Sequence, residues 1–156
     1  MKKFTDLIEE TLPEIREVFP WDMEELEQNK NNILLLDTRE PYEFDAMRIE
    51  GSLNVPRGIL ETACEWGFVE TEPELVEARE RPVVVICRSG NRSALAAYTM
   101  QQLGYRDVYS LKTGLRGWND YELPLIDNDG NRVDPDAAEE YFAPDLRPEQ
   151  MPPEQR

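Results

Sequence analysis

The sequence contains no histidine and only two cysteines, Cys64 and Cys87. Without histidine, the chain has neither an imidazole base nor a histidine ligand for a metal ion. Two cysteines are too few for a disulfide framework, so a reducing compartment and a cytoplasmic location are expected. No apolar run approaches the about 20 residues of a membrane helix, and acids interrupt the N-terminal segment where a secretory signal would be apolar.

Basic residues are also scarce. The chain has 17 lysines and arginines against 33 aspartates and glutamates, which gives a formal net charge of −16. Such a balance argues against nucleic acid and anionic membranes as partners. The simplest interpretation of the excess is a solubilising surface. An acidic docking face for a basic partner is the alternative.

The few basic residues are unevenly spread. Residues 88–118 contain a single acid, Asp107, and five bases: Arg88, Arg92, Arg106, Lys112 and Arg116. This basic island begins directly after Cys87. Its position favours a small anionic substrate over a polyanion.

Short apolar runs alternate with helical patterns through the middle of the chain. Strands are expected at 33–36, 52–55, 83–86 and 108–111, and helices at 58–66, 73–79, 93–103 and 115–121. This alternation predicts an α/β domain with a mostly parallel central sheet flanked by helices. Ligands of such sheets bind at the carboxyl ends of the strands, and Cys87 follows one of those ends.

The two ends of the chain differ from this middle part. Residues 1–17 carry apolar side chains at helical spacing and are expected to form a helical extension, which either packs on the domain or binds a partner. Residues 126–156 are acidic and rich in proline. They are expected to form an extended arm with one aromatic anchor, a turn near Asp129 and Gly130, and a frayed end. The expected division is therefore 1–17, 18–125 and 126–156.

The segment from Cys87 to Ser93 carries the clearest chemical signal. Between a strand and a helix, successive N–H groups of such a loop can turn inward and form a nest for an anion. The start of the following helix adds a positive dipole end, and Arg88 and Arg92 add charge. All of these groups favour a thiolate at Cys87 without any base. The alternative is a cysteine that packs in the core, but its polar, cationic and glycine-containing neighbours are not those of a core.

Three segments together resemble the single-domain rhodaneses, the thiosulfate and persulfide sulfurtransferases. "CRSGNRS" (87–93) resembles their active-site loop. "LLDTREPYEFDAMRIEGSLNVPRG" (35–58) resembles their N-terminal signature, and "GLRGWNDYELPL" (114–125) resembles their closing segment. The resemblance covers residues 18–125 and implies a three-layer rhodanese-like domain.

Residue roles follow from this resemblance. Cys87 matches the nucleophile that becomes a persulfide. The residues that match the loop around the outer sulfur are Arg88, Ser89, Gly90, Asn91, Arg92 and Ser93. Asp37, Arg39 and Trp118 match structural positions. The chain departs from the family at Met47-Arg48, where Gly-His is frequent, and at Thr113-Gly114, where Gly-Gly is frequent.

The implied reaction moves sulfane sulfur from thiosulfate or a persulfide donor to cyanide, a thiol or a sulfur-carrier protein, with no metal or organic cofactor. Two alternatives remain open. One is a sulfur-relay or regulatory module that serves a single protein partner. The other is a phosphatase or arsenate reductase of the same fold, but those enzymes use a loop one residue longer than the four residues between Cys87 and Arg92.

The second thiol, Cys64, has two interpretations. It is either a buried helix residue or a resolving cysteine that forms a disulfide with Cys87 or accepts its sulfur.

Overall fold

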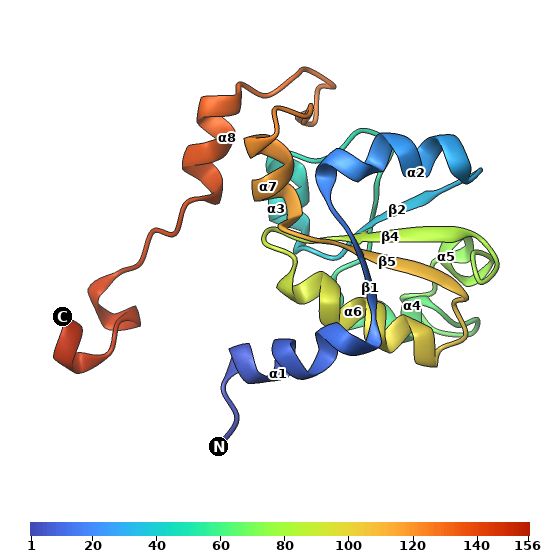
Figure 1. Ribbon diagram of the computed structural model, residues 1–156, viewed down its shortest axis with the longest axis horizontal. Helices are drawn as coiled ribbons and strands as arrows, with labels where there is room; N and C mark the ends of the chain where they lie inside the picture. Colours follow the sequence, from blue (N-terminus) through green and yellow to red (C-terminus); the bar gives the residue numbers. More distant parts are fainter.

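A five-stranded parallel sheet forms the centre of the computed structural model, which describes residues 1–156 (Figure 1). The strand order is β1-β5-β4-β2-β3, and each neighbouring pair runs parallel. The strands are β1 (Arg16–Val18), β2 (Leu34–Asp37), β3 (Leu53–Asn54), β4 (Pro82–Ile86) and β5 (Asp107–Leu111). This confirms the α/β class with a parallel sheet that the alternating pattern predicts.

Eight α-helices and five 3₁₀ turns connect and extend the strands. The helices are α1 (Phe4–Thr11), α2 (Met23–Asn29), α3 (Pro41–Ala46), α4 (Leu60–Ala63), α5 (Pro73–Val76), α6 (Asn91–Gln102), α7 (Gly114–Asp120) and α8 (Pro135–Phe142). The 3₁₀ turns are η1 (Leu12–Glu14), η2 (Pro20–Asp22), η3 (Arg57–Ile59), η4 (Pro148–Gln150) and η5 (Pro153–Gln155). None of these helices has the length and apolar character needed to cross a membrane.

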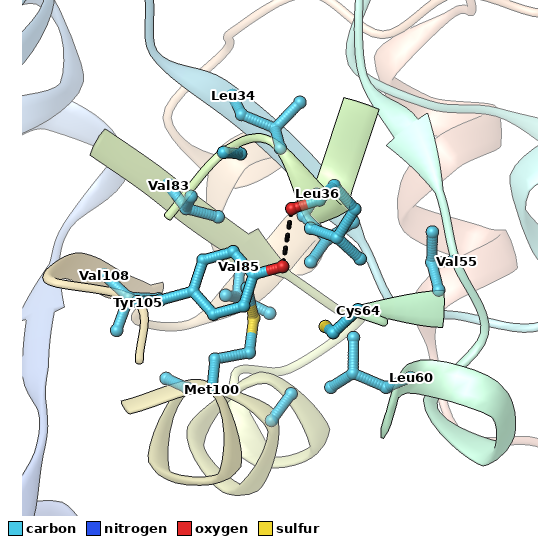
Figure 2. Packing of buried hydrophobic residues seen from close by; sticks show 14 of the residues in the cluster. Leu34, Leu36, Val55, Leu60, Cys64, Val83, Val85, Met100, Tyr105 and Val108 are labelled. Carbon is cyan, nitrogen blue, oxygen red and sulfur yellow. Dashed lines mark hydrogen bonds between the residues drawn. The ribbon is translucent and has the colours of Figure 1, made fainter. Parts of the chain in front are cut away.

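The sheet separates two hydrophobic clusters, and β4 contributes to both. Val83 and Val85 face one cluster, while Val84 and Ile86 face the other, because successive side chains of a strand point to opposite faces. The first cluster lies under α4, α5 and α6 (Figure 2), and the second lies under α2, α7 and α8. Helices therefore cover both faces of the sheet, which gives the expected three layers (Figure 1).

Strand β1 is absent from the expected elements. Arg16 and Glu17, in the range expected to be a helical extension, pair with Tyr109 and Ser110 of β5. Only Val18 of this strand is buried. A three-residue strand at the sheet edge with one buried side chain has no apolar run that would reveal it.

The C-terminal arm also contains an element that was not expected. Helix α8 begins after Asp134, whose carboxylate accepts a hydrogen bond from the Ala137 amide at 3.3 Å. Its Phe142 side chain is 1% exposed and packs in the second cluster, so it is the aromatic anchor of the arm. Beyond Ala143 every residue except the half-buried Met151 is exposed, and the chain leads away from the domain (Figure 1).

We expect Phe142→Ala to lower the free energy of unfolding by about 3–5 kcal/mol, because it leaves a cavity in the second cluster. Urea denaturation followed by circular dichroism measures this change. The matched control is Leu146→Ala, because Leu146 is 61% exposed and its loss should change stability by less than about 0.5 kcal/mol. Equal stabilities of the two variants would show that α8 is not anchored through Phe142.

Asp107 links the edge strand β1 and the segment after α2 to β5. Its carboxylate lies 2.8 Å from Lys30 Nζ and 3.0 Å from Arg16 Nη2. Burial by itself raises the pKa of Asp107, but hydrogen bonds with Lys30 and Tyr109 and the charges of Lys30 and Arg16 lower it, and the net pKa lies below its ordinary value of 3.8. A carboxyl group whose pKa falls on folding stabilises the fold above its ordinary pKa and ceases to do so as the pH falls through the depressed value.

We therefore expect Asp107→Asn to destabilise the protein at neutral pH, and this difference to shrink as the pH falls below about 3.8. Urea unfolding of both proteins across a pH series measures it. Asp45→Asn, at an exposed aspartate outside every ion pair, should show no such pH-dependent difference. A destabilisation by Asp107→Asn that stays constant with pH would contradict the ion-pair account.

Candidate functional site

Cys87 lies at the carboxyl edge of the sheet, immediately after the last residue of β4, Ile86. The end of β2 is fastened beside it, since the amide and the hydroxyl of Thr38 both donate to the Ile86 carbonyl, at 2.9 and 3.0 Å. The Cys87 side chain is completely buried. The structure thus places the thiol where the strand pattern predicts a ligand site, between the central strands and the start of α6.

Residues 87–93, which we name the cysteine loop, surround the sulfur with hydrogen-bond donors. The amides of Gly90 and Ser93 donate to Cys87 Sγ at 3.1 and 3.3 Å, and Ser93 Oγ lies 3.4 Å from the same atom. Ser93 Oγ is also 2.7 Å from Ser110 Oγ on β5. Two backbone amides of the loop therefore point at the same sulfur atom, and the thiol itself donates to the Ser93 hydroxyl.

The start of α7 determines which way the cysteine loop faces. The Leu115 amide donates to the Cys87 carbonyl at 2.9 Å, and the Arg116 amide donates to the Arg88 carbonyl at 3.0 Å. Because these carbonyls are bonded to α7, the loop can direct its N–H groups at the sulfur. A Cβ atom at Gly114 would lie 2.5 Å from the Arg88 carbonyl, so only glycine permits this approach.

Thr113 stands where the resemblance implies the first glycine of a Gly-Gly pair, and the backbone here favours glycine at both Thr113 and Gly114. Both residues have positive φ angles, 68° and 61°. This region is open to glycine and strained for a β-branched residue. The Thr113 hydroxyl is also buried without a hydrogen-bond partner. Thr113 therefore holds the turn before α7 at a cost in backbone strain.

The two loop arginines have different surroundings. Arg92 forms a bidentate ion pair with Glu43 of α3, at 2.8 and 3.0 Å, whereas Arg88 is exposed and belongs to no ion pair. The hydrogen bond that Arg92 donates to Glu43 is the main cause of the raised pKa of Arg92. Burial raises the pKa of Glu43, but Arg92, a hydrogen bond from the Glu40 backbone and the charge of Arg39 together outweigh burial, and the net pKa is lowered.

Sequence reasoning missed Glu43. It lies in the acidic helix of the N-terminal signature, but nothing in the spacing shows that this carboxylate reaches the cysteine loop across 49 residues. Its charge compensates one of the two arginines expected around the thiol. The net positive charge beside Cys87 is therefore smaller than the sequence suggests.

Asp37 and Arg39 form a buried pair beside the cysteine loop, at the end of β2. The Arg39 guanidinium donates to the Asp37 carboxylate at 2.9 to 3.2 Å and to the Met47 carbonyl at 2.6 Å. The Asn54 side-chain amide donates to the carbonyls of both residues. These contacts join β2, β3 and the segment after α3, which is the geometry of a structural brace. Arg39 Nη1 is buried without a hydrogen-bond partner.

Trp118, Arg48 and Arg57 make contacts within other parts of the structure. Trp118 packs in the second cluster and donates to the Pro124 carbonyl at 3.0 Å. Arg48 donates to Asn128 and Phe44, and Arg57 contacts Glu61 and Thr99. Both arginines are therefore occupied with structural partners.

Cys64 is completely buried in the first cluster, among the residues under α4 and α6 (Figure 2). Burial is the main cause of its raised pKa, and a hydrogen bond with Tyr105 and the charge of Arg79 offset only part of the effect. Both cysteines are free thiols. A buried thiol that resists ionisation is a poor nucleophile, so the environment of Cys64 is that of a core residue.

Comparison with known proteins gives a consistent family. A sulfurtransferase of Allochromatium vinosum is 34% identical over 113 residues, covering 70% of this chain and 95% of its own length. A thiosulfate sulfurtransferase of Tolumonas auensis is 29% identical over 89 residues, covering 56% of this chain and 73% of its own. The chain spans only 21% of an adenylyltransferase and sulfurtransferase of Drosophila virilis, to which it is 32% identical over 96 residues.

Among solved structures, a Rhodopseudomonas palustris protein described as of unknown function and as a possible tyrosine phosphatase superposes with a TM-score of 0.69. It is 28% identical, and the match covers 80% of this chain and 94% of that one. The model of the rhodanese-like domain matches residues 22–121, which include the cysteine loop, the Asp37–Arg39 brace and most of the sheet. On this match, the chain belongs to the rhodanese-like family.

Proposed function

We propose that the protein is a sulfurtransferase that carries sulfane sulfur on Cys87, with thiosulfate or a persulfide as the donor. The observation that supports this most directly is the convergence of the Gly90 and Ser93 amides on Cys87 Sγ within a loop of four residues between Cys87 and Arg92. A loop of this length suits one sulfur atom. The names of the relatives agree with sulfur transfer.

The first half of the proposed reaction loads the cysteine. The Cys87 thiolate attacks the outer sulfur of thiosulfate, a bond forms between the two sulfur atoms, and the bond to the sulfonate sulfur breaks with its electron pair, releasing sulfite. Arg88 and Arg92 attract the dianionic donor, and the loop amides stabilise the charge on the persulfide. Because Cys87 has no exposed surface, side chains at the loop must move to admit the donor.

The second half of the reaction unloads the cysteine. An acceptor nucleophile such as cyanide or a thiolate attacks the outer sulfur, and Cys87 departs as a thiolate with the electron pair of the broken bond. Neither half requires a proton to be removed from the nucleophile at each turnover. The absence of histidine is therefore compatible with this chemistry, and we expect it to proceed without a metal or an organic cofactor.

A phosphatase is the second candidate, because of the Rhodopseudomonas palustris neighbour. A tetrahedral phosphate carries several oxygens that each need a hydrogen-bond donor, and it therefore needs a wider loop than one sulfur atom does. The short spacing between Cys87 and Arg92 and the Glu43 carboxylate on Arg92 both disfavour it.

Brief exposure to thiosulfate should add one sulfur atom to the intact protein, and cyanide should remove it again. Intact-protein mass spectrometry measures both steps. The Cys87→Ser variant should gain nothing, whereas Cys64→Ala, which keeps the loop, should gain the atom as the wild type does. A gain of one sulfur atom by Cys87→Ser would contradict the proposal. So would hydrolysis of p-nitrophenyl phosphate by a wild-type protein that gains no sulfur.

We expect Arg92→Ala to reduce kcat/KM for thiosulfate by about 10- to 100-fold. This is the effect expected when one or two charge-assisted hydrogen bonds to the transition state are lost. The variant also leaves the Glu43 carboxylate unpaired beside an anionic donor. Arg92→Ala combined with Glu43→Gln should therefore recover part of the loss.

The matched control for this series is Arg106→Ala. Arg106 belongs to the same basic island, but it is exposed and its only ion pair is with Glu80, also exposed. The Arg106→Ala variant should have the same kcat/KM for thiosulfate as the wild type. Steady-state kinetics with thiosulfate as donor and cyanide as acceptor, followed through the thiocyanate formed, measure the rates of both variants. Equal rates for Arg92→Ala and Arg106→Ala would show that Arg92 does not act on the donor.

A further inference from the structure

Two exposed aromatic side chains form a ridge beside the cysteine loop. Trp21 of η2 is 49% exposed and Tyr121, just after α7, is 54% exposed. Their ring centroids are 5.7 Å apart, and Trp21 also stacks on Phe19 at 4.4 Å. Large aromatic side chains held in place at a surface, with much of their area open to water, are typical of binding sites.

A hollow lined by both rings of this ridge reaches the cysteine loop. Its volume is about 450 Å³, and its walls include Ser89, Arg116 and Asp120 together with Trp21 and Tyr121. Ser89 lies two residues after Cys87 in the loop. A molecule held against the ridge is therefore next to the loop that holds the sulfur.

The same two rings also line a second, apolar pocket. Its volume is about 360 Å³, and apolar side chains such as Met23, Leu35, Ile49 and Leu123 line most of it. Trp21 and Tyr121 belong to both hollows, so the two spaces adjoin along the ridge. An occupant of both spaces has to be elongated, and longer than thiosulfate or cyanide.

The charges of the apolar pocket indicate the chemistry of its occupant. Three exposed carboxylates line it, those of Glu24, Glu27 and Glu50, and it contains no basic side chain. None of the three takes part in an ion pair within the chain. Carboxylates next to exposed indole and phenol rings attract an ammonium or guanidinium group, both by charge and through the ring faces.

We propose that this surface docks a basic, partly apolar segment of a protein acceptor and presents the thiol of that segment to Cys87. An apolar side chain of the segment fills the pocket, lysine or arginine side chains lie against Glu24, Glu27 and Glu50, and the backbone crosses the ridge toward Ser89. This acceptor role rests on the proposed function. In the transfer, the acceptor thiolate attacks the outer sulfur of the Cys87 persulfide, the new bond forms between those two sulfurs, and Cys87 leaves as a thiolate.

Binding is measured first, on the full-length Cys87→Ser protein, so that the result does not depend on sulfur chemistry. The probes are three peptides of sequence Cys-Gly-Lys-Leu-Lys, Cys-Gly-Glu-Leu-Glu and Cys-Gly-Lys-Ser-Lys, each labelled with fluorescein and followed by fluorescence anisotropy. The first should bind at least about tenfold more tightly than the second and several-fold more tightly than the third, with an affinity that falls as NaCl rises.

Variants then assign the binding to this surface. Glu24→Gln combined with Glu27→Gln should weaken binding of the basic apolar peptide about three- to tenfold, as expected for two exposed ion pairs, and Trp21→Ala should weaken it about tenfold. The matched control combines Glu65→Gln and Glu70→Gln. It makes the same charge change at two exposed glutamates that line neither hollow, and should leave the affinity unchanged.

The rate of sulfur transfer from the Cys87 persulfide of the wild type to the three peptides should follow the same order, while the rate to cyanide should be the same in wild type and pocket variants. Equal affinities for the basic and acidic peptides, or equal weakening by both glutamate pairs, would overturn the docking proposal. So would binding of benzyltrimethylammonium without binding of any peptide, because the pocket would then be a small-cation site. Peptide binding with the predicted preference, together with sulfur transfer to cyanide but to none of the peptides, would refute the acceptor role of this surface. Absence of sulfur transfer to cyanide as well as to the peptides would refute the proposed function instead.

Discussion

The cysteine loop owes its shape to the hydrogen bonds that its carbonyls make with α7. The Cys87 and Arg88 carbonyls are held by the Leu115 and Arg116 amides, and Gly114 packs directly against them. A backbone whose carbonyls are fastened on one side offers its amides on the other. The sulfur environment is therefore a product of helix packing, and it depends on the second hydrophobic cluster under α7, including its C-terminal anchor.

Much of this arrangement could be predicted from the sequence because its signals are local. A run of β-branched residues, a short polar loop with glycine and an alanine-rich helix place Cys87 at the carboxyl edge of a buried strand, and the structure has β4 and α6 there. The Asp37–Arg39 brace lies within three residues of one strand end. Helix α8 was hidden by the acidic, proline-rich composition of the arm, although Asp134 and Pro135 are a good helix start.

What could not be predicted depends on contacts between distant segments. Glu43 reaches Arg92, Ser93 reaches Ser110, and β1 pairs with β5. No periodicity relates these partners, because the topology of the sheet brings them together. The same topology brings Trp21 and Tyr121, which are distant in the sequence, into contact next to the cysteine loop.

In the cysteine loop, the groups that contact the thiol differ from those that face the solvent, and this affects how the site can change. Two backbone amides, which every residue except proline supplies, and the Ser93 hydroxyl face the sulfur, whereas the Arg88 and Ser89 side chains are exposed. Positions 88 and 89 are thus free to vary without disturbing the sulfur cradle, while Gly90 and Gly114 are not. The backbone groups around the thiol and the side chains open to solvent are separate, so the exposed face of the loop can change by a few substitutions while the surroundings of the thiol stay the same.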